Sequence, residues 1–119
     1  KKRKKLANLY TKKLINTSLQ LPVQKGNYQH VFHLYTVYHP KRDLIMKELN
    51  KRNIQTKIYY PFPIHKMKAY HNLKSKKLDL PITEKKSKGI FSLPLYPKMK
   101  DSDVNKIATT LINIVKKFK

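Results

Sequence analysis

Apolar residues recur at helical spacing in two segments, one near each end of the chain. Near the start they lie three or four positions apart with lysines between them, at Leu6, Leu9, Tyr10 and Leu14. This spacing predicts an amphipathic helix that ends at about Asn16, where polar residues follow. Near the other end, a second set of apolar residues shares one helical face: Val104, Ile107, Ala108, Leu111, Val115 and Phe118. That pattern predicts a terminal helix with Asp101 as its N-cap residue.

Three segments have the composition of β-strands. The first, residues 30–38, is rich in aromatic and β-branched side chains, and both of its faces are largely apolar, which is typical of a buried strand. The second, residues 54–58, alternates apolar with polar positions, and the third, residues 90–94, is stopped by a proline. A further extended piece at residues 19–24 contains a proline, so we expect an edge or a connector there, followed by a turn at residues 25–27.

Two further helices are expected between these strands. Pro40 ends the first strand and opens a helix, with Asp43 in the first turn, where the helix dipole favours negative charge. We expect its buried face to consist of Leu44, Ile45 and Leu49. A shorter helix begins within residues 80–84, where a proline stands near its start. The alternation of helices and strands predicts an α+β fold, with a small antiparallel or mixed sheet of about three strands packed by helices.

Two prolines restrict the segment that follows the second predicted strand. Pro61 and Pro63 disfavour both helix and strand interior, because each fixes φ and removes a backbone donor. The same restriction lowers the entropy that the loop, residues 59–65, would lose around a ligand. Tyr60 and His65 can offer hydrogen bonds to such a ligand. The alternative is that Tyr60 and Phe62 are packed core residues beneath a stiff turn.

Charge is the most unusual property of the composition. The 119 residues include 25 Lys and 3 Arg against 6 acidic residues, which gives a formal net charge of +22. Such a charge suggests nucleic acid or another anionic surface as a partner. The excess is nearly all lysine, however, whereas arginine is favoured for bidentate phosphate contacts. Because Lys, Asn and Ile are abundant together, as A/T-rich codons would produce, we expect the charge mainly to solvate the surface, and nucleic acid to be an unlikely partner.

The composition also excludes several kinds of active site. The chain has no cysteine, so disulfides and thiolate sites are absent, and its two isolated glycines cannot build a glycine-rich phosphate loop. The five histidines stand in separate places. His30 and His33 would face opposite sides of a strand, so we expect structural roles for both and no metal site. Four of the six carboxylates lie where helix caps and first turns favour negative charge: Asp43, Glu84, Asp101 and Asp103. No self-sufficient active site is therefore predicted.

No membrane or export segment is predicted. The longest nearly apolar run, residues 89–96, is far shorter than a membrane span. The basic opening at residues 1–5 is not followed by the apolar stretch of a secretory signal. Because the first residue is Lys rather than Met, we expect the chain to be a piece of a longer protein. We expect that protein to be located in the cytoplasm.

Four blocks of sequence resemble a known enzyme family, and they occur in the family's order. The blocks are the strand HVFHLY (30–35), the unit from KRDL to NIQT (41–56), the loop IYYPFPIH (58–65) followed by AY (69–70), and the segment from LPITE to SLPLYP (80–97). In these blocks the chain resembles the C-terminal small domain of the DegT/DnrJ/StrS family of sugar-nucleotide aminotransferases. These are fold type I enzymes that use pyridoxal phosphate (PLP). Tyr59 stands where the family usually has His, and Asn53 where it usually has Gly, for which Asn is a reasonable substitute at a helix end.

The resemblance implies how the chain is organised. Residues 1–27 would be a helix and connector leading from a large domain that this chain lacks, and residues 28–119 would be the aminotransferase small domain. The family's catalytic lysine lies in a glycine-rich stretch of the large domain that has no counterpart here. No catalytic residue can therefore be nominated in this chain, its cofactor-binding residues stay unknown, and we expect the piece alone to bind no PLP.

The resemblance also implies a function. The full-length enzyme would transfer an amino group, typically from glutamate, to a keto-sugar nucleotide in nucleotide-sugar and surface-polysaccharide biosynthesis, and would be a homodimer. The small domain would close one side of the substrate cleft as a lid, with Tyr59, Tyr60 and His65 as candidate substrate-binding residues. The alternative is a stand-alone basic module that binds nucleic acid or an anionic surface and retains the fold without the chemistry.

Overall fold

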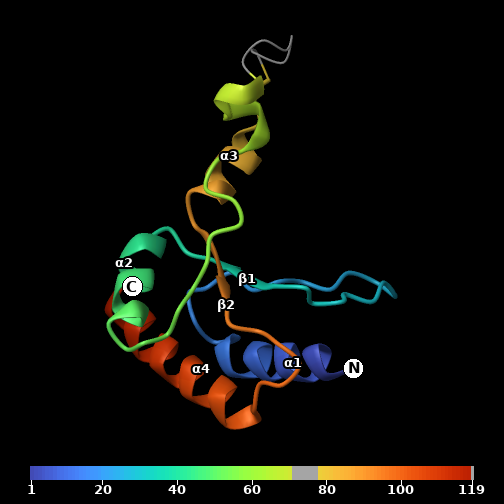
Figure 1. Ribbon diagram of the computed structural model, residues 1–119, viewed down its shortest axis with the longest axis vertical. Coiled ribbons are helices and arrows are strands. Elements are labelled where there is room, and N and C mark those ends of the chain that lie inside the picture. Colours follow the sequence, from blue (N-terminus) through green and yellow to red (C-terminus); the bar gives the residue numbers. More distant parts are fainter. Residues whose placement is uncertain (71–77, 119) are drawn as a thin grey trace.

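The computed structural model describes residues 1–70 and 78–118, which contain four α-helices and a two-stranded antiparallel sheet (Figure 1). The helices are α1 (Lys2–Leu14), α2 (Arg42–Asn50), α3 (Pro81–Ser87) and α4 (Asp101–Val115). The strands are β1 (Tyr35–Tyr38) and β2 (Ile90–Leu93), and there are short 3-10 helices η1 (Ile64–Lys66), η2 (Lys68–Tyr70) and η4 (Lys116–Phe118). The α+β class and the four predicted helices are thus confirmed. Within the described ranges, no helix combines the length and the hydropathy that a bilayer crossing requires.

The two strands pair in a register that puts apolar side chains opposite each other in the core. Tyr35 pairs with Leu93 at one end of the ladder, and both side chains are buried. The next pair is polar, since the hydroxyls of Thr36 and Ser92 lie 2.8 Å apart and share a hydrogen bond. Because of this alternation, the polar side chain on the partly exposed face of β1 has a hydrogen-bond partner, while the other face of the strand packs on the helices.

Single β-bridges flank this sheet where longer pairing was expected. Gln20 pairs with Tyr38, and Lys57 pairs with Ser92. The prediction of a second strand over residues 54–58 is therefore wrong in extent, because only Lys57 joins the sheet. The chain crosses the edge of β2 at that point and then leaves it toward two prolines, which lack the N–H that a ladder requires.

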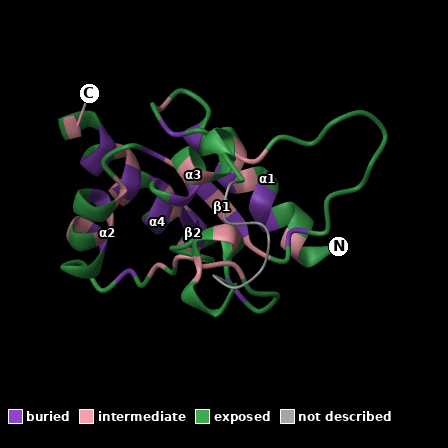
Figure 2. Ribbon diagram, turned by 90° about the horizontal axis from the view of Figure 1, so that it is seen from above, coloured by how far each residue is buried: buried purple, intermediate pink, exposed green. Residues whose placement is uncertain are grey.

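The first predicted strand is also shorter than residues 30–38. Pairing begins only at Tyr35, because Phe32 has a left-handed backbone with φ 48° that breaks the extended conformation. His30 stabilises this bend locally, since its Nδ1 accepts a hydrogen bond of 2.9 Å from the backbone N–H of Phe32. Most of residues 21–34 consequently form an exposed loop that extends from the body of the molecule, as Figure 2 shows.

The core lies where α1 and α4 pack against the sheet, and α2 packs on α4 (Figures 1 and 2). Two fully buried tyrosines form its centre: the rings of Tyr10 and Tyr35 lie 5.0 Å apart. Each buried hydroxyl has a partner, because Tyr10 donates to the carbonyl of Pro94 at 3.0 Å and Tyr35 shares a hydrogen bond of 2.8 Å with Thr11. These bonds allow large aromatic side chains to be buried without an unpaired polar group.

Two helix details differ from the expectation. Leu44 is 48% exposed, so only Ile45 and Leu49 of the expected face of α2 are buried. Its position one residue before Ile45 turns it about 100° around the helix, away from α4. The N-cap of α4 is Lys100 rather than Asp101, and the backbone N–H of Lys100 donates to the carboxylate of Asp103 at 3.1 Å.

The expected turn residues behave as predicted. Asn53 has φ 57° three positions after the end of α2, in the left-handed region that Asn tolerates better than most residues. The backbone N–H of the following Ile54 donates to the carbonyl of Leu49 at 3.1 Å, which closes the helix end. Gly26 also has a positive φ, 56°, within the predicted turn at residues 25–27.

Candidate functional site

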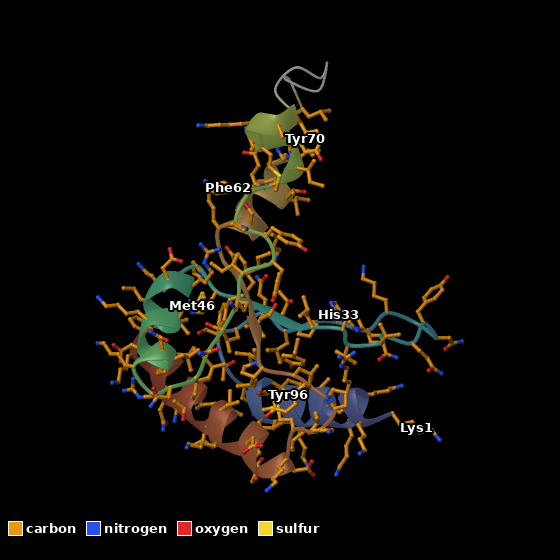
Figure 3. All side chains as sticks on the ribbon, in the orientation of Figure 1. Lys1, His33, Met46, Phe62, Tyr70 and Tyr96 are labelled. Carbon is orange, nitrogen blue, oxygen red and sulfur yellow. The ribbon has the colours of Figure 1, made fainter. Side chains whose placement is uncertain are left out.

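An arm projects from the helical body of the molecule (Figure 1). We use this name for residues 59–70 and 78–88, which include η1, η2 and α3. Pro63 has an extended backbone and is the N-cap residue of η1, so the second of the two prolines sets the direction of the chain into the arm. Figure 3 shows Phe62 and Tyr70 on this arm, well separated from Tyr96 beside α1.

Two of the three predicted site residues, Tyr59 and Tyr60, stand at the start of the arm. Their rings lie 5.7 Å apart and nearly perpendicular, at 83°. Tyr59 is 40% exposed and Tyr60 is 67% exposed. The neighbouring Phe62 is 66% exposed, so the structure contradicts the alternative in which Tyr60 and Phe62 are packed core residues.

A largely apolar groove of about 660 Å³ runs along the arm. We call it the arm groove; its lining includes Tyr60, Phe62, Ile64, His65, Leu80 and Ile82. The structure therefore brings Tyr60 and His65 into one groove, whereas Tyr59 does not line it. Apolar walls with a few polar groups are typical of small-molecule sites.

His65 is held inside the arm by an acidic residue from α3. Its Nε2 lies 3.0 Å from Oε1 of Glu84, and its side chain is only 7% exposed. The ammonium of Lys66 lies 3.2 Å from the same oxygen. The hydrogen bond from His65, followed by the one from Lys66, lowers the pKa of the Glu84 carboxyl below its usual value, so the carboxylate is ionised at neutral pH.

Glu84 is the site residue that the sequence analysis missed. Its position in the first turn of a predicted helix explained its charge, and nothing in the sequence linked it to a histidine 19 positions earlier. The two residues meet only because η1 and α3 lie side by side in the arm. The single available signal was that a short, solvent-facing helix carried one acid among several lysines.

The base of the arm is fixed to the body by Arg42 and Gly89. Nη1 of Arg42, at the start of α2, donates to the carbonyl of Ser87 at 2.7 Å. A Cβ on Gly89 would lie 2.4 Å from the ring of Tyr38 and 2.8 Å from the carbonyl of His39, so only glycine allows this approach. The return of the arm into β2 is therefore closely packed against β1.

His39 is a buried histidine with a structural role. Its Nδ1 accepts a hydrogen bond of 3.0 Å from the backbone N–H of Lys41, and its Nε2 lies 3.2 Å from the hydroxyl of Ser18. Burial, followed by the charge of Lys41, lowers the pKa of the imidazole below its ordinary value, so it is neutral at pH 7. It joins the segment after α1 to the start of α2.

The other histidines do not converge on a metal. Among residues 1–70 and 78–118, no group of three His, Cys, Asp or Glu side chains is placed to hold an ion. The ring of His30 lies 4.2 Å from the ring of Phe32, at the bend that His30 stabilises. His33 is exposed. His71 lies outside the described residues.

Comparison with known proteins identifies the family. The sequence profile of the DegT/DnrJ/EryC1/StrS aminotransferase family matches residues 1–112. The chain belongs to this family. It is also 31% identical over 109 residues to UDP-N-acetyl-3-dehydro-alpha-D-glucosamine 3-aminotransferase of Acidithiobacillus ferrooxidans, an alignment that covers 92% of this chain and 29% of that enzyme. The resemblance drawn from the sequence blocks is thus confirmed.

Two solved structures have the same fold as this chain. S. venezuelae DesV, in complex with a ketimine intermediate, matches 97% of this chain with a TM-score of 0.91 and 28% identity, over 31% of its own length. NtdA from Bacillus subtilis, with the bound cofactor PMP, matches 97% of this chain with a TM-score of 0.81 and 31% identity, over 28% of its own length. This chain therefore spans less than a third of the length of each of these three proteins.

The described residues do not fit the family's cofactor. A lysine that forms a Schiff base is activated by burial or by a neighbouring charge, whereas every lysine in residues 1–70 and 78–118 is exposed to solvent. The two glycines stand in separate turns and form no phosphate cradle. Among the described residues there is thus neither a buried lysine suited to a Schiff base nor a glycine-rich phosphate loop.

Proposed function

We propose that this chain is the C-terminal small domain of a PLP-dependent aminotransferase, in which residues 1–27 lead from a large domain and residues 28–119 form the small domain. The full-length enzyme transfers an amino group, typically from glutamate, to a keto-sugar nucleotide, and it acts as a homodimer. The small domain lacks the catalytic lysine and is inactive alone. In the complete enzyme, the arm is a lid at the substrate cleft.

The observation that carries this proposal is the exposed apolar arm. Phe62, Ile64 and Ile82 are each at least 66% exposed, although they lie beside one another along the arm groove. A contiguous apolar surface on a highly charged domain is characteristic of a binding site. The names of the relatives support a sugar nucleotide as the substrate, since the enzyme of Acidithiobacillus ferrooxidans is named for a UDP-linked sugar.

The residues of the arm have three tasks in this proposal. The apolar side chains of the groove exclude water from the substrate. The hydroxyl of Tyr60 and the imidazole of His65 bind polar groups of the sugar, and Tyr59 contacts the substrate from outside the groove. The family's cofactor, bound by the large domain, supplies the amino-transfer chemistry, to which this chain contributes orientation of the substrate.

A chimera with S. venezuelae DesV tests the proposal, because the two folds match closely. Residues 1–119 replace the matching region of DesV, and turnover of the DesV substrate by the chimera is measured. We expect the chimera to be active. Tyr60→Phe and His65→Ala should each reduce kcat/KM by up to about tenfold, which corresponds to one lost hydrogen bond of about 0.5–1.5 kcal/mol. The absorbance of the bound cofactor should not change.

Tyr96→Phe is the matched control. It removes the same hydroxyl from a tyrosine that is 51% exposed and lies beside α1, away from the arm (Figure 3). This variant should retain the kcat/KM of the chimera. Unchanged kinetics in Tyr60→Phe and His65→Ala, with a lowered melting temperature instead, would show that the loop only packs, and would remove both residues from the site.

A further inference from the structure

The contact between Glu84 and His65 restricts how the imidazole can bind a ligand. A carboxylate only accepts hydrogen bonds, so the contact of 3.0 Å requires a proton on Nε2 of His65. In a neutral imidazole the other nitrogen, Nδ1, then carries a lone pair and acts as an acceptor. Among the described residues, Nδ1 has no hydrogen-bond partner. Glu84 thereby determines which ring nitrogen of His65 is the donor and which is the acceptor.

The described residues that line the rest of the arm groove are mostly uncharged. Tyr60, Phe62 and Ile82 give it an aromatic and aliphatic wall. Among the described residues that line the groove, the one lysine is Lys86, whose ammonium lies 4.5 Å from the centre of the Tyr38 ring and bonds to the side chain of Gln20. A phosphate needs several donors, whereas a sugar ring offers an apolar C–H face together with single hydroxyl or amide donors.

We propose that Glu84 is a positioning residue that holds the Nε2 proton of His65, so that the arm groove receives the uncharged sugar ring of the substrate through one hydroxyl or amide N–H donor, and not its diphosphate. This inference rests on the proposed function, because it assigns a part of the sugar nucleotide to the same site. It also gives Glu84 a role beyond the favourable placement of a negative charge in the first turn of α3.

The state of the imidazole is tested by NMR of the 119-residue chain labelled with nitrogen-15 at histidine, at a pH at which His65 is neutral. We expect Nε2 of His65 to carry a proton that is protected from exchange, and Nδ1 to carry none. Glu84→Ala should lose this protected signal. Glu84→Gln should retain it, because the amide oxygen can accept the same hydrogen bond. A proton on Nδ1 in the unmodified chain, or a protected signal that persists in Glu84→Ala, would overturn the proposal.

Glu48→Ala is the matched control for this experiment. Glu48 is likewise an acid that pairs with two basic residues, Lys51 and Arg52, but it lies on α2 and not on the arm. Its loss changes the net charge equally and should leave the His65 signal in place. Signals of the buried Tyr10 and Tyr35 report that each variant is folded, so a lost signal can be assigned to the arm.

The chemistry of the ligand is tested with two probes, the methyl glycoside of N-acetylglucosamine and inorganic diphosphate. The glycoside should shift the signals of Tyr60, Phe62 and His65, and Glu84→Ala should weaken its binding by up to about tenfold. Diphosphate should leave these three residues unchanged. The reverse selectivity, or no effect of the glycoside on the groove, would overturn the inference. An inactive DesV chimera would instead overturn the proposed function, and it would leave the imidazole result standing.

Discussion

The guanidinium of Arg42 and the backbone carbonyl of Ser87 form a hydrogen bond of 2.7 Å between residues 45 positions apart. Arg42 begins α2 on the body and Ser87 ends α3 on the arm, so this bond fixes the position of the arm. The side chain of Arg42 is only 11% exposed, and its Nε also donates to Asp43 at 2.8 Å. The planar guanidinium presents its N–H donors in a rigid fork, so one buried side chain satisfies both acceptors at once.

Arg42→Ala should therefore destabilise the chain by about 1.5–3 kcal/mol, because it removes a hydrogen bond from a charged donor and leaves the Ser87 carbonyl unpaired. The measurement is the free energy of unfolding in urea. Arg52→Ala serves as the control: Arg52 is 42% exposed and pairs with Glu48, so its loss should cost less than about 1 kcal/mol. Equal losses in the two variants would contradict the anchoring role of Arg42.

Stability should decrease as the pH falls below about 6.5, the ordinary pKa of histidine. Burial lowers the pKa of His39 in the folded chain, so the unfolded chain binds more protons in this range and acid favours unfolding. Urea unfolding at pH 7.5 and pH 5.5 measures the difference. His39→Asn should reduce it, since the Asn oxygen can still accept from Lys41 but cannot titrate. The same slope in His39→Asn and in the exposed variant His33→Asn would show that His39 is not the cause.

The isolated chain should not form a specific adduct with PLP. Its described lysines are all exposed, so none has the environment that activates a Schiff-base lysine. Incubation with PLP, reduction with borohydride and mass spectrometry of the peptides should give low labelling spread over several lysines. One adduct per chain at a single lysine would refute the prediction, and with it the assignment of cofactor chemistry to the large domain.

Binding to DNA should be weak and independent of sequence, although the net charge is +22. Contacts between exposed lysines and phosphates release counterions, so the affinity should fall steeply between about 50 and 200 mM salt. Fluorescence polarisation with labelled duplex and single-stranded DNA measures this dependence. Tight binding that survives physiological salt and prefers one sequence would instead support the stand-alone basic module.

Local signals in the sequence determined the helices and turns. The spacing of apolar residues specified α1 and α4, because a helix is built from hydrogen bonds four residues apart and its buried face is visible within one segment. Asn53 and Gly26 marked the left-handed positions for the same reason, since their backbone freedom is a property of the single residue. The order of four sequence blocks was enough to indicate the family, which the comparison then confirmed.

Contacts between distant segments decided the rest. Residues 30–34 have strand-like side chains but bend at Phe32, and residues 54–58 alternate correctly but meet β2 at Lys57 alone. Whether such residues pair depends on where the partner strand begins and ends, which no local pattern contains. The arm groove and the contact between His65 and Glu84 arise in the same way, because short-range electrostatic and apolar contacts form only after the chain has brought η1 and α3 together.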